Sequence, residues 1–163
     1  MAKRQEAEPV RPNTVAMLGQ AYSLLGFRIV DGVVGSGHPI KPSHSAVFAQ
    51  VEPGGSRLTK LAAGANITPQ SMGVIVDELE ELGYVERRPD PADRRAKLIT
   101  LTALGRDAVA AGEATITGIE EDLVAILGER GARQLRRLLS SILASESQEA
   151  AGHRSSSGGS PIK

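Results

Sequence analysis

The segment from residue 58 to residue 102 constrains the fold more than any other part of the chain. It contains two short helical patterns separated by a turn at Asn66, and then two segments rich in β formers, Tyr84–Arg88 and Lys97–Leu101. Thr68 followed by a proline is a helix start signal, so the second helical pattern has a defined beginning. The β-rich segments enclose a loop of prolines and aspartates, which predicts a hairpin. A helix beside a hairpin with a cationic tip predicts a winged helix-turn-helix, mainly α with a small β-hairpin wing (α+β).

The composition limits the classes of protein to which the chain can belong. It has 163 residues, 2% aromatic residues, no cysteine and a formal net charge of zero. The core must therefore be aliphatic, and disulfides, thiol redox sensing and cysteine-ligated metal sites are excluded. A neutral chain is not a general nucleic-acid coat, but a sequence-specific DNA-binding protein needs only local positive charge. That local charge is provided by Arg87, Arg88, Arg94, Arg95 and Lys97.

The sequence contains no targeting or membrane signal. No apolar run approaches the ~20 residues that a membrane span needs, and the charged start leads into no apolar segment of a secretory signal. We therefore expect a cytoplasmic, nucleoid-associated protein. No cofactor is predicted.

Helical patterns precede and follow the winged segment. Apolar residues recur at spacings of three and four after a cap at Asn13 or Thr14, and a glycine-rich stretch ends that helix. Further helices are expected from Ser43 to Val51, from a cap at Ser56, from a cap at Thr102 to about Leu127, and from about Ala132 to Ser145. The expected division is a flexible arm (1–12), dimerisation and support helices (13–56), the winged helix-turn-helix DNA-binding unit (57–102), a long helix with a C-terminal dimerisation helix (103–146) and a disordered tail (147–163).

The first and last helices carry long apolar stripes beside a winged unit that has its own small core. They either complete one globular core or form a dimer interface from both chain ends. We favour the dimer, because a palindromic DNA site requires two DNA-binding units at a fixed spacing. The predicted dimer residues are Val15, Leu18, Tyr22, Leu135, Leu138, Leu139 and Ile142.

An ordered set of short motifs resembles the MarR family of bacterial winged helix-turn-helix regulators. The motifs are Leu61-Ala62, Asn66-Ile67-Thr68, Gln70-Ser71-Met72, Val76 to Glu80, Leu82 to Arg87, Asp90 to Lys97 and Leu101 to Gly105. The resemblance covers most of residues 13–145, and the order and spacing of the motifs make it specific. It implies a homodimer with intertwined terminal helices that binds a palindromic operator. It also implies that a small, often phenolic or otherwise aromatic, ligand releases the DNA.

The predicted recognition helix offers few polar groups for base contacts. Gln70 is expected to contact adenine, and Val74 a thymine methyl group. Ser71 can bond a base edge or a phosphate, and Thr68 with the helix N-terminus can hold a phosphate. The alternatives are plain capping by Thr68 and Ser71 and a solvated Gln70. Gly73 and Val74 stand where relatives often carry polar or cationic residues, so recognition is expected to depend on methyl contacts and DNA shape.

The wing supplies the positive charge. One of Arg94 and Arg95, with Arg94 preferred, is expected to enter the minor groove, while the other pairs with Asp93 and holds the loop. Contacts to phosphates are expected from Arg87, Arg88 and Lys97, and more weakly from Arg57 and Lys60. The alternative is a solvated basic hairpin with surface ion pairs worth ~0–1 kcal/mol each.

The resemblance implies a ligand site between the terminal helices and the winged unit. The candidate residues are Tyr22, Phe27, His38, His44 and Phe48. A histidine there would donate to a ligand carboxylate, and an aromatic ring would stack on the ligand. The alternative places Tyr22 and Phe48 in the core and His38 in a surface loop. His38 and His44 with Asp31 or Glu52 form a weaker candidate for zinc, because no ligand spacing is diagnostic.

Other classes of protein match the sequence less well. An enzyme is not expected, since there is no nucleophile–base pair, no metal set, and a glycine-rich stretch that follows a helix rather than a strand. A winged module that binds only proteins does not need an arginine-tipped wing. A ligand-insensitive DNA-binding regulator, or an activator, is the alternative to a ligand-released repressor.

Overall fold

The computed structural model describes residues 13–156, except for the side chains of Arg94 and of residues 146–156. The chain forms two compact units, Met1–Ile116 and Thr117–Lys163. The predicted arm, 1–12, and the end of the predicted tail, 157–163, lie outside the described residues. Within the described part of the chain, no helix has the length and apolar character needed to cross a membrane.

The first unit opens with helix α1 (Thr14–Gly35). It begins at Asn13, whose side-chain oxygen accepts a hydrogen bond from the backbone N–H of Ala16 at 2.9 Å. Such a cap satisfies one of the free amides at the helix start, as predicted. Only Val30 and Val33 of α1 are buried, so the N-terminal half of the helix does not belong to the core of this unit.

Two short helices follow α1 where the sequence predicted one. They are the 3-10 helix η1 (Pro42–His44) and helix α2 (Ser45–Phe48). The prediction of a single helix from Ser43 to Val51 is therefore wrong. The imidazole Nδ1 of His44 accepts the backbone N–H of Lys41 at 3.2 Å, which closes a tight first turn ahead of α2.

The helix-turn-helix consists of α3 (Leu58–Gly64) and α4 (Pro69–Glu81). Asn66, at the predicted turn between them, has φ of 54°, the left-handed conformation that asparagine tolerates at the end of a helix. Ser56 does not cap α3, contrary to the prediction. It is buried in strand β1 (Ser56–Arg57), and its hydroxyl accepts the backbone N–H of Glu52 at 3.1 Å. Pairing with the hairpin therefore determined the conformation of Ser56.

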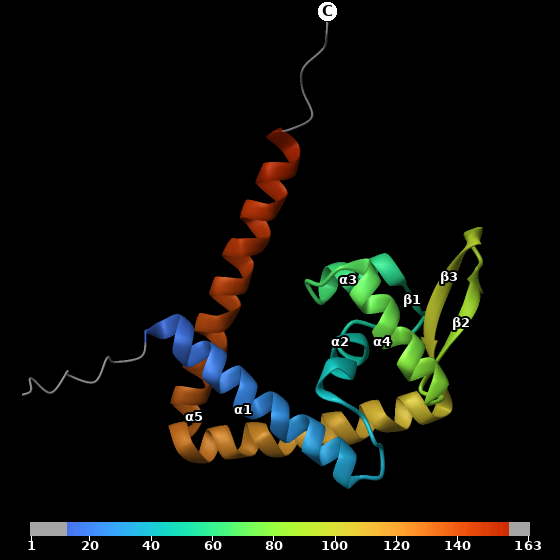
Figure 1. The fold of residues 1–163 in the computed structure, drawn as a ribbon. Helices are drawn as coiled ribbons and strands as arrows, with labels where there is room; N and C mark the ends of the chain where they lie inside the picture. Colours follow the sequence, from blue (N-terminus) through green and yellow to red (C-terminus); the bar gives the residue numbers. More distant parts are fainter. Residues whose placement is uncertain (1–12, 157–163) are drawn as a thin grey trace, which may run out of the picture. The chain divides into compact units, whose positions relative to one another are not determined.

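The wing is part of a three-stranded antiparallel sheet with the order β1-β3-β2. Strands β2 (Val85–Asp90) and β3 (Asp93–Leu101) form the predicted hairpin, which is longer than the β-rich segments indicated because the pairing extends to Asp90 opposite Asp93. A register shift between Pro89 and Asp90 marks an irregularity near the tip. Figure 1 shows the hairpin projecting beside α4.

An aliphatic core joins α4, the sheet and the surrounding helices, as the scarcity of aromatic residues predicted. The side chains of Met72, Val76 and Leu79 on one face of α4 are fully buried. They pack in one cluster with Val47, Leu61, Tyr84, Val85 and Ile99. The opposite face of α4 is consequently free to contact something other than the protein.

Helix α5 (Ala103–Ser156) follows the wing. The Thr102 hydroxyl donates to the carbonyl of Gly83 at 2.7 Å and accepts the N–H of Gly105 at 3.1 Å, which confirms it as the cap. A Cβ on Gly105 would lie 2.0 Å from the carbonyl oxygen of Tyr84, so only glycine fits there. Gly128, with φ of 68° and ψ of 160°, interrupts the helix within the predicted break. The helix then continues to Ser156, whereas the sequence predicted a disordered tail from residue 147.

Candidate nucleic-acid interface

The exposed face of α4 carries the residues that were predicted to contact bases. Gln70, Ser71 and Val74 are all exposed, and the side chain of Val74 is 57% exposed. The Val74 side chain offers an apolar group that can contact the methyl group of a thymine. The face therefore combines one apolar group with the amide of Gln70, as a surface that contacts DNA bases requires.

The start of α4 is held by hydrogen bonds within the helix. The Thr68 hydroxyl accepts the backbone N–H of Ser71 at 3.1 Å, and the two hydroxyl oxygens are 2.9 Å apart. The capping alternative for Thr68 is thus realised in the structure. Because each hydroxyl has a partner, a phosphate contact by Thr68 or Ser71 has to share that group with the cap.

Arg87 connects the wing to α4. Its guanidinium forms ion pairs with Asp77, at 2.5 Å, and with Glu80, and its backbone N–H donates to Glu80 at 3.1 Å. Arg88 pairs with Glu86 on its own strand at 2.6 Å. Both arginines were predicted to lie near phosphates. The structure supplies each of them with a carboxylate from the protein, which offsets the positive charge locally, and contact with phosphates stays a prediction.

Arg57 holds the tip of the wing. Its guanidinium donates to the buried carboxylate of Asp90 at 2.8 and 2.6 Å, and a phosphate contact would have to share the guanidinium with this carboxylate. The second oxygen of Asp90 accepts the N–H of Ala92 at 2.8 Å. The Ala92 N–H and the Arg57 guanidinium together lower the pKa of Asp90. The turn at the end of the hairpin is therefore fixed by charge as well as by strand pairing.

Arg95 and Lys97 keep exposed cationic groups on the wing. Neither forms an ion pair with another described side chain. The sequence predicted that one wing arginine pairs with Asp93; among the described side chains, the guanidinium that pairs with Asp93 belongs to Arg57, at 4.0 Å. Asp93 instead accepts the backbone N–H of Arg95 at 3.0 Å, which orients the strand and leaves that side chain available. Arg94 lies beside it in β3.

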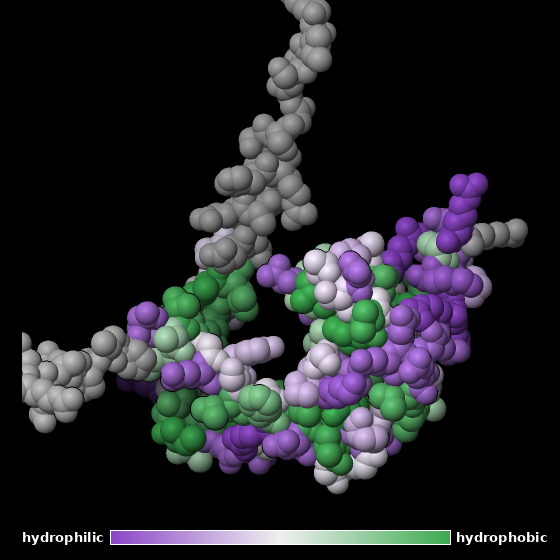
Figure 2. All heavy atoms as spheres, in the orientation of Figure 1, coloured by the Kyte–Doolittle hydropathy of each residue, from purple (hydrophilic) through white to green (hydrophobic). Residues whose placement is uncertain are grey.

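Hydrophilic side chains gather over the hairpin and the neighbouring end of α4, as Figure 2 shows. Helix α4 itself contains no lysine or arginine, and four of its last five residues are acidic, namely Asp77, Glu78, Glu80 and Glu81. Charge for a phosphate backbone must therefore come from the wing. Lys60, the other weak candidate, is paired with Glu52 at 2.5 Å.

Three of the predicted ligand residues lie in or against the core. His44 is completely buried, and its Nε2 lies 3.0 Å from Glu78 while Nδ1 accepts from Lys41. His38 is 5% exposed, with its ring nitrogens 3.4 Å from the Tyr84 hydroxyl and 3.4 Å from Asp107. Phe48 packs edge-on against Tyr84, with ring centroids 5.9 Å apart. His38 is thus not a surface loop residue, and both histidines already use both ring nitrogens.

The other two predicted ligand residues lie on α1. Tyr22 is 80% exposed and Phe27 is 58% exposed, so Tyr22 does not belong to the core either. The structure does not bring the five candidates together. Among the described side chains no three histidines, aspartates or glutamates converge as metal ligands, and the suggested zinc set has no counterpart there.

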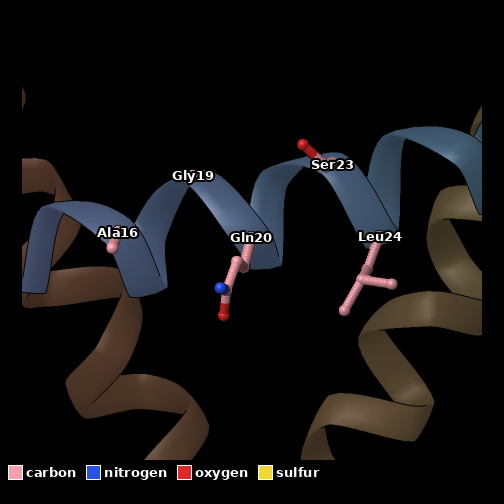
Figure 3. A pocket seen from close by; sticks show the side chains of 5 residues that line it. All are labelled: Ala16, Gly19, Gln20, Ser23 and Leu24. Atoms are coloured by element: carbon pink, nitrogen blue, oxygen red, sulfur yellow. The ribbon is translucent and has the colours of Figure 1, made fainter. Parts of the chain in front are cut away.

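A shallow hollow follows one face of α1 and is lined by Ala16, Gly19, Gln20, Ser23 and Leu24. Figure 3 shows the side chains of Ala16, Gln20 and Leu24 on one side of the helix, with Ser23 pointing elsewhere. Gly19 leaves the space open because it has no side chain. None of the predicted ligand residues lines this hollow, although Tyr22 and Phe27 are on the same helix.

Sequence reasoning missed the acidic side chains that hold α4. The sequence predicted no partner for Asp77, Glu78 or Glu80. In the structure Asp77 and Glu80 pair with the wing, while Glu78 pairs with Lys41 and His44 of the η1 segment. Helical spacing could not identify these partners, because they come from 7 to 37 positions away.

Gly73 provides a test of whether α4 closely approaches another molecule. It lies inside α4, and an added Cβ would meet nothing within 4 Å. Gly73→Ala is expected to raise the free energy of unfolding by ~0.4–1 kcal/mol, since alanine is favoured within helices. If α4 enters a DNA groove, the same methyl group should lower DNA affinity. The control is Gly118→Ala in α5, where an added Cβ would also meet nothing within 4 Å. This variant should stabilise the protein without changing its affinity for DNA. Equal affinity of Gly73→Ala and wild type would place Gly73 away from DNA.

The wing tip should lose stability in acid. The pKa of Asp90 is lowered in the folded protein, so its stabilising contribution is present above the ordinary range of an aspartate and is lost as the pH falls through the folded value. Asp90→Asn keeps an acceptor oxygen for Ala92 but no charge for Arg57. We expect this variant to be less stable than wild type at pH 7 and closer to it in acid, as measured by urea unfolding below and above pH ~3.9. Asp31→Asn, an exposed change on α1, is the control. A constant difference at all pH values would contradict this role of Asp90.

Comparisons with known proteins agree with this architecture. A family model described as the MarR family matches residues 38–96. This range includes the end of the segment between α1 and η1, the helix-turn-helix and most of the wing. The HTH-type transcriptional repressor Rv2887 of Mycobacterium tuberculosis is 32% identical over 80 residues. That match covers 49% of this chain and 58% of the relative, so the chain spans little more than half of the curated protein it matches.

Two solved structures extend the similarity over most of the chain. The crystal structure of CouR from Rhodococcus jostii RHA1 bound to p-coumaroyl-CoA is 26% identical, has a TM-score of 0.66, and covers 80% of this chain and 91% of its own. A transcriptional regulator (MarR family) from Rhodococcus sp. RHA1 is 25% identical, has a TM-score of 0.65, and covers 78% of this chain and 90% of its own. With the fold and the ordered motifs described above, residues 38–96 match the MarR family, and the chain is similar over most of its length to winged helix-turn-helix regulators of that family.

Proposed function

We propose that this protein is a sequence-specific double-stranded DNA-binding transcriptional regulator, acting as a dimeric repressor on a palindromic operator. The observation that carries the proposal is the exposed face of α4, with Gln70, Ser71 and Val74, beside a hairpin that presents Arg95 and Lys97 without ion-pair partners among the described side chains. The helix would enter the major groove, and the wing would contact the adjoining minor groove or phosphates. The name of the relative Rv2887, a transcriptional repressor, supports the direction of regulation.

Exposed apolar side chains near both ends of the described chain support a homodimer. On α1, Val15 is 79% exposed and Tyr22 is 80% exposed; after Gly128, Leu138 and Ile142 are about half exposed. Leu18 is exposed to a lesser extent, and Leu135 and Leu139 are partly buried. Leaving this much apolar surface in water is unfavourable, and a second copy would cover it. The dimer would place two copies of α4 at the spacing of two half-sites.

The proposal also includes release of the operator DNA when a small aromatic ligand binds. It is supported by the CouR structure, whose ligand, p-coumaroyl-CoA, contains an aromatic acyl group. On this chain Tyr22 and Phe27 are the exposed aromatic residues, and we propose that such a ligand contacts α1 near them. His38, His44 and Phe48 are not part of this proposal, because the two histidines are buried and Phe48 packs against the core. A ligand-insensitive regulator, or an activator, is the alternative.

The experiment is a selection from a random-sequence DNA pool followed by binding titrations. We expect an enriched inverted repeat, bound at least ~10³-fold more tightly than a scrambled duplex of the same composition and with an affinity that falls steeply with salt. Adding aromatic acids and their thioesters to the complex tests release. If no sequence is enriched, DNA recognition is wrong; if an inverted repeat is bound but no aromatic compound releases it, the ligand-insensitive alternative holds.

A further inference from the structure

Helix α4 is held by ion pairs in two directions, toward the wing and toward the η1 segment. Asp77 and Glu80 lie on the flank toward the wing and pair with Arg87. Glu78 is 200° away from Glu80 around the helix axis, at 100° per residue, and lies beside Ser71 and Val74 on the exposed face. There its Oε2 lies 2.9 Å from Nζ of Lys41 and 3.0 Å from Nε2 of His44. The two polar contacts from the η1 segment to α4 therefore converge on one carboxylate.

The hydrogen bonds of His44 define its protonation state. Nδ1 accepts the backbone N–H of Lys41 at 3.2 Å, so this nitrogen carries no proton. The single ring proton is on Nε2, and the neutral imidazole donates it to Glu78. Since the side chain is 0% exposed, water cannot replace either bond. The pKa of Glu78 is lowered by the hydrogen bond from His44 first and by that from Lys41 second, which keeps this carboxylate ionised and able to accept both.

The bond from His44 is better suited to setting a position than the bond from Lys41. The Lys41 side chain is 63% exposed and flexible, so it loses entropy when it is held in one conformation. The His44 ring is enclosed by the core and is fixed at both nitrogens. Glu78 lies eight residues, or about 12 Å along the helix axis, from Gln70. A small tilt of α4 at Glu78 would therefore displace Gln70 relative to a base edge, where hydrogen bonds require good geometry.

We propose that His44 is a positioning residue for the recognition helix: its neutral imidazole, fixed in the Nε2–H tautomer, holds Glu78 and thereby sets the orientation in which α4 meets DNA bases. This role rests on the proposed DNA-binding function. It differs from a ligand contact, because both ring nitrogens are bound within the protein. It also differs from general packing, because it depends on one donor atom at one place.

Replacing His44 by glutamine or by asparagine distinguishes the role of the Nε2–H donor from that of the rest of the ring. The amide nitrogen of His44→Gln can reach the place of Nε2 and donate to Glu78, whereas His44→Asn is one carbon shorter and can only replace the acceptor at Nδ1. The measurement is the affinity of each variant for the enriched inverted repeat and for a scrambled duplex of the same length and composition. We expect His44→Asn to lose ten-fold or more of the preference for the inverted repeat, and His44→Gln to retain most of it. Affinity for the scrambled duplex should stay constant, because it depends on the wing charges.

A double-mutant cycle tests whether His44 acts through Glu78. In a Glu78→Ala background, His44→Asn should have little further effect on the preference for the inverted repeat, because the carboxylate that accepts the hydrogen bond is already absent. Thermal unfolding of each variant confirms that it is folded, and should any His44 variant fail to fold, Glu78→Gln against Glu78→Ala makes the same comparison from the acceptor side. Equal preference of His44→Asn and His44→Gln, or multiplicative effects in the cycle, would overturn this role of His44. If the wild type itself shows no preference, it is the proposed function that fails.

Discussion

Arg94→Ala and Arg95→Ala should each weaken binding to the inverted repeat, and the one whose guanidinium enters the minor groove should lose ~1–3 kcal/mol. Arg95 is exposed and has no ion pair with another described side chain, and Arg94 precedes it in β3. A narrow A·T-rich minor groove concentrates negative potential, so an unpaired guanidinium gains more there than near an isolated phosphate. The measurement is a titration of each variant at several salt concentrations. The slope of log affinity against log salt should decrease by about one for each phosphate contact that is lost.

Arg88→Ala is the matched control for the wing arginines. Arg88 is on the same hairpin, but its guanidinium pairs with Glu86 at 2.6 Å. Removing a charge that is already compensated should change DNA affinity less than removing an uncompensated one. If Arg88→Ala weakens binding as much as both tip variants do, the distinction between paired and unpaired arginines does not describe the bound state.

Leu138→Glu with Ile142→Glu should convert the proposed dimer into a monomer and abolish tight binding to the inverted repeat. The two side chains are one helical turn apart and are 52% and 48% exposed, so in a monomer charged groups could remain in water at little cost. In a dimer they would be buried without partners, which is strongly unfavourable. A monomer contacts one half-site only, and the expected loss of affinity is on the order of 10²–10⁴-fold, the usual gain from linking two binding units.

Sedimentation of the double variant and of wild type measures the mass directly. Ser140→Glu is the control, since it lies 200° from Leu138 on the same helix and is exposed. It should leave both mass and DNA affinity unchanged. A wild-type protein that sediments as a monomer at the concentrations at which it binds DNA would refute the proposed dimer.

The helix boundaries and the hairpin followed from the sequence wherever the determining interaction is local. Asn13, Thr68 and Thr102 cap their helices with their own side chains, and these caps depend on residues three positions away. Asn66 adopts a left-handed conformation that few other residues tolerate. The buried face of α4 follows from helical spacing alone. Capping, turn conformation and periodicity are therefore recoverable from one sequence.

Local rules failed where pairing or packing with distant residues decided the outcome. Ser56 has the chemistry of a helix cap, but pairing with Ile99 in β3 places it in a strand. His38 lies in a glycine-rich segment that suggests a surface loop, yet its ring is buried 5.8 Å from that of Tyr84. Whether such a residue is buried depends on which segments pack over it, and this is not encoded in its neighbours along the chain.

The amino-acid sequence by itself indicated the resemblance to the MarR family, the order of the elements and the location of positive charge, because these depend on residue type and spacing. Only the tertiary structure determined which charges are available. It pairs Arg57, Arg87 and Arg88 with carboxylates and leaves Arg95 and Lys97 without ion-pair partners among the described side chains. It also buries the His44 ring and places its Nε2 3.0 Å from Glu78. The physical reason is that the net electrostatic effect of a charged group depends on the opposite charges within a few ångströms, and folding brings those together from distant positions in the chain.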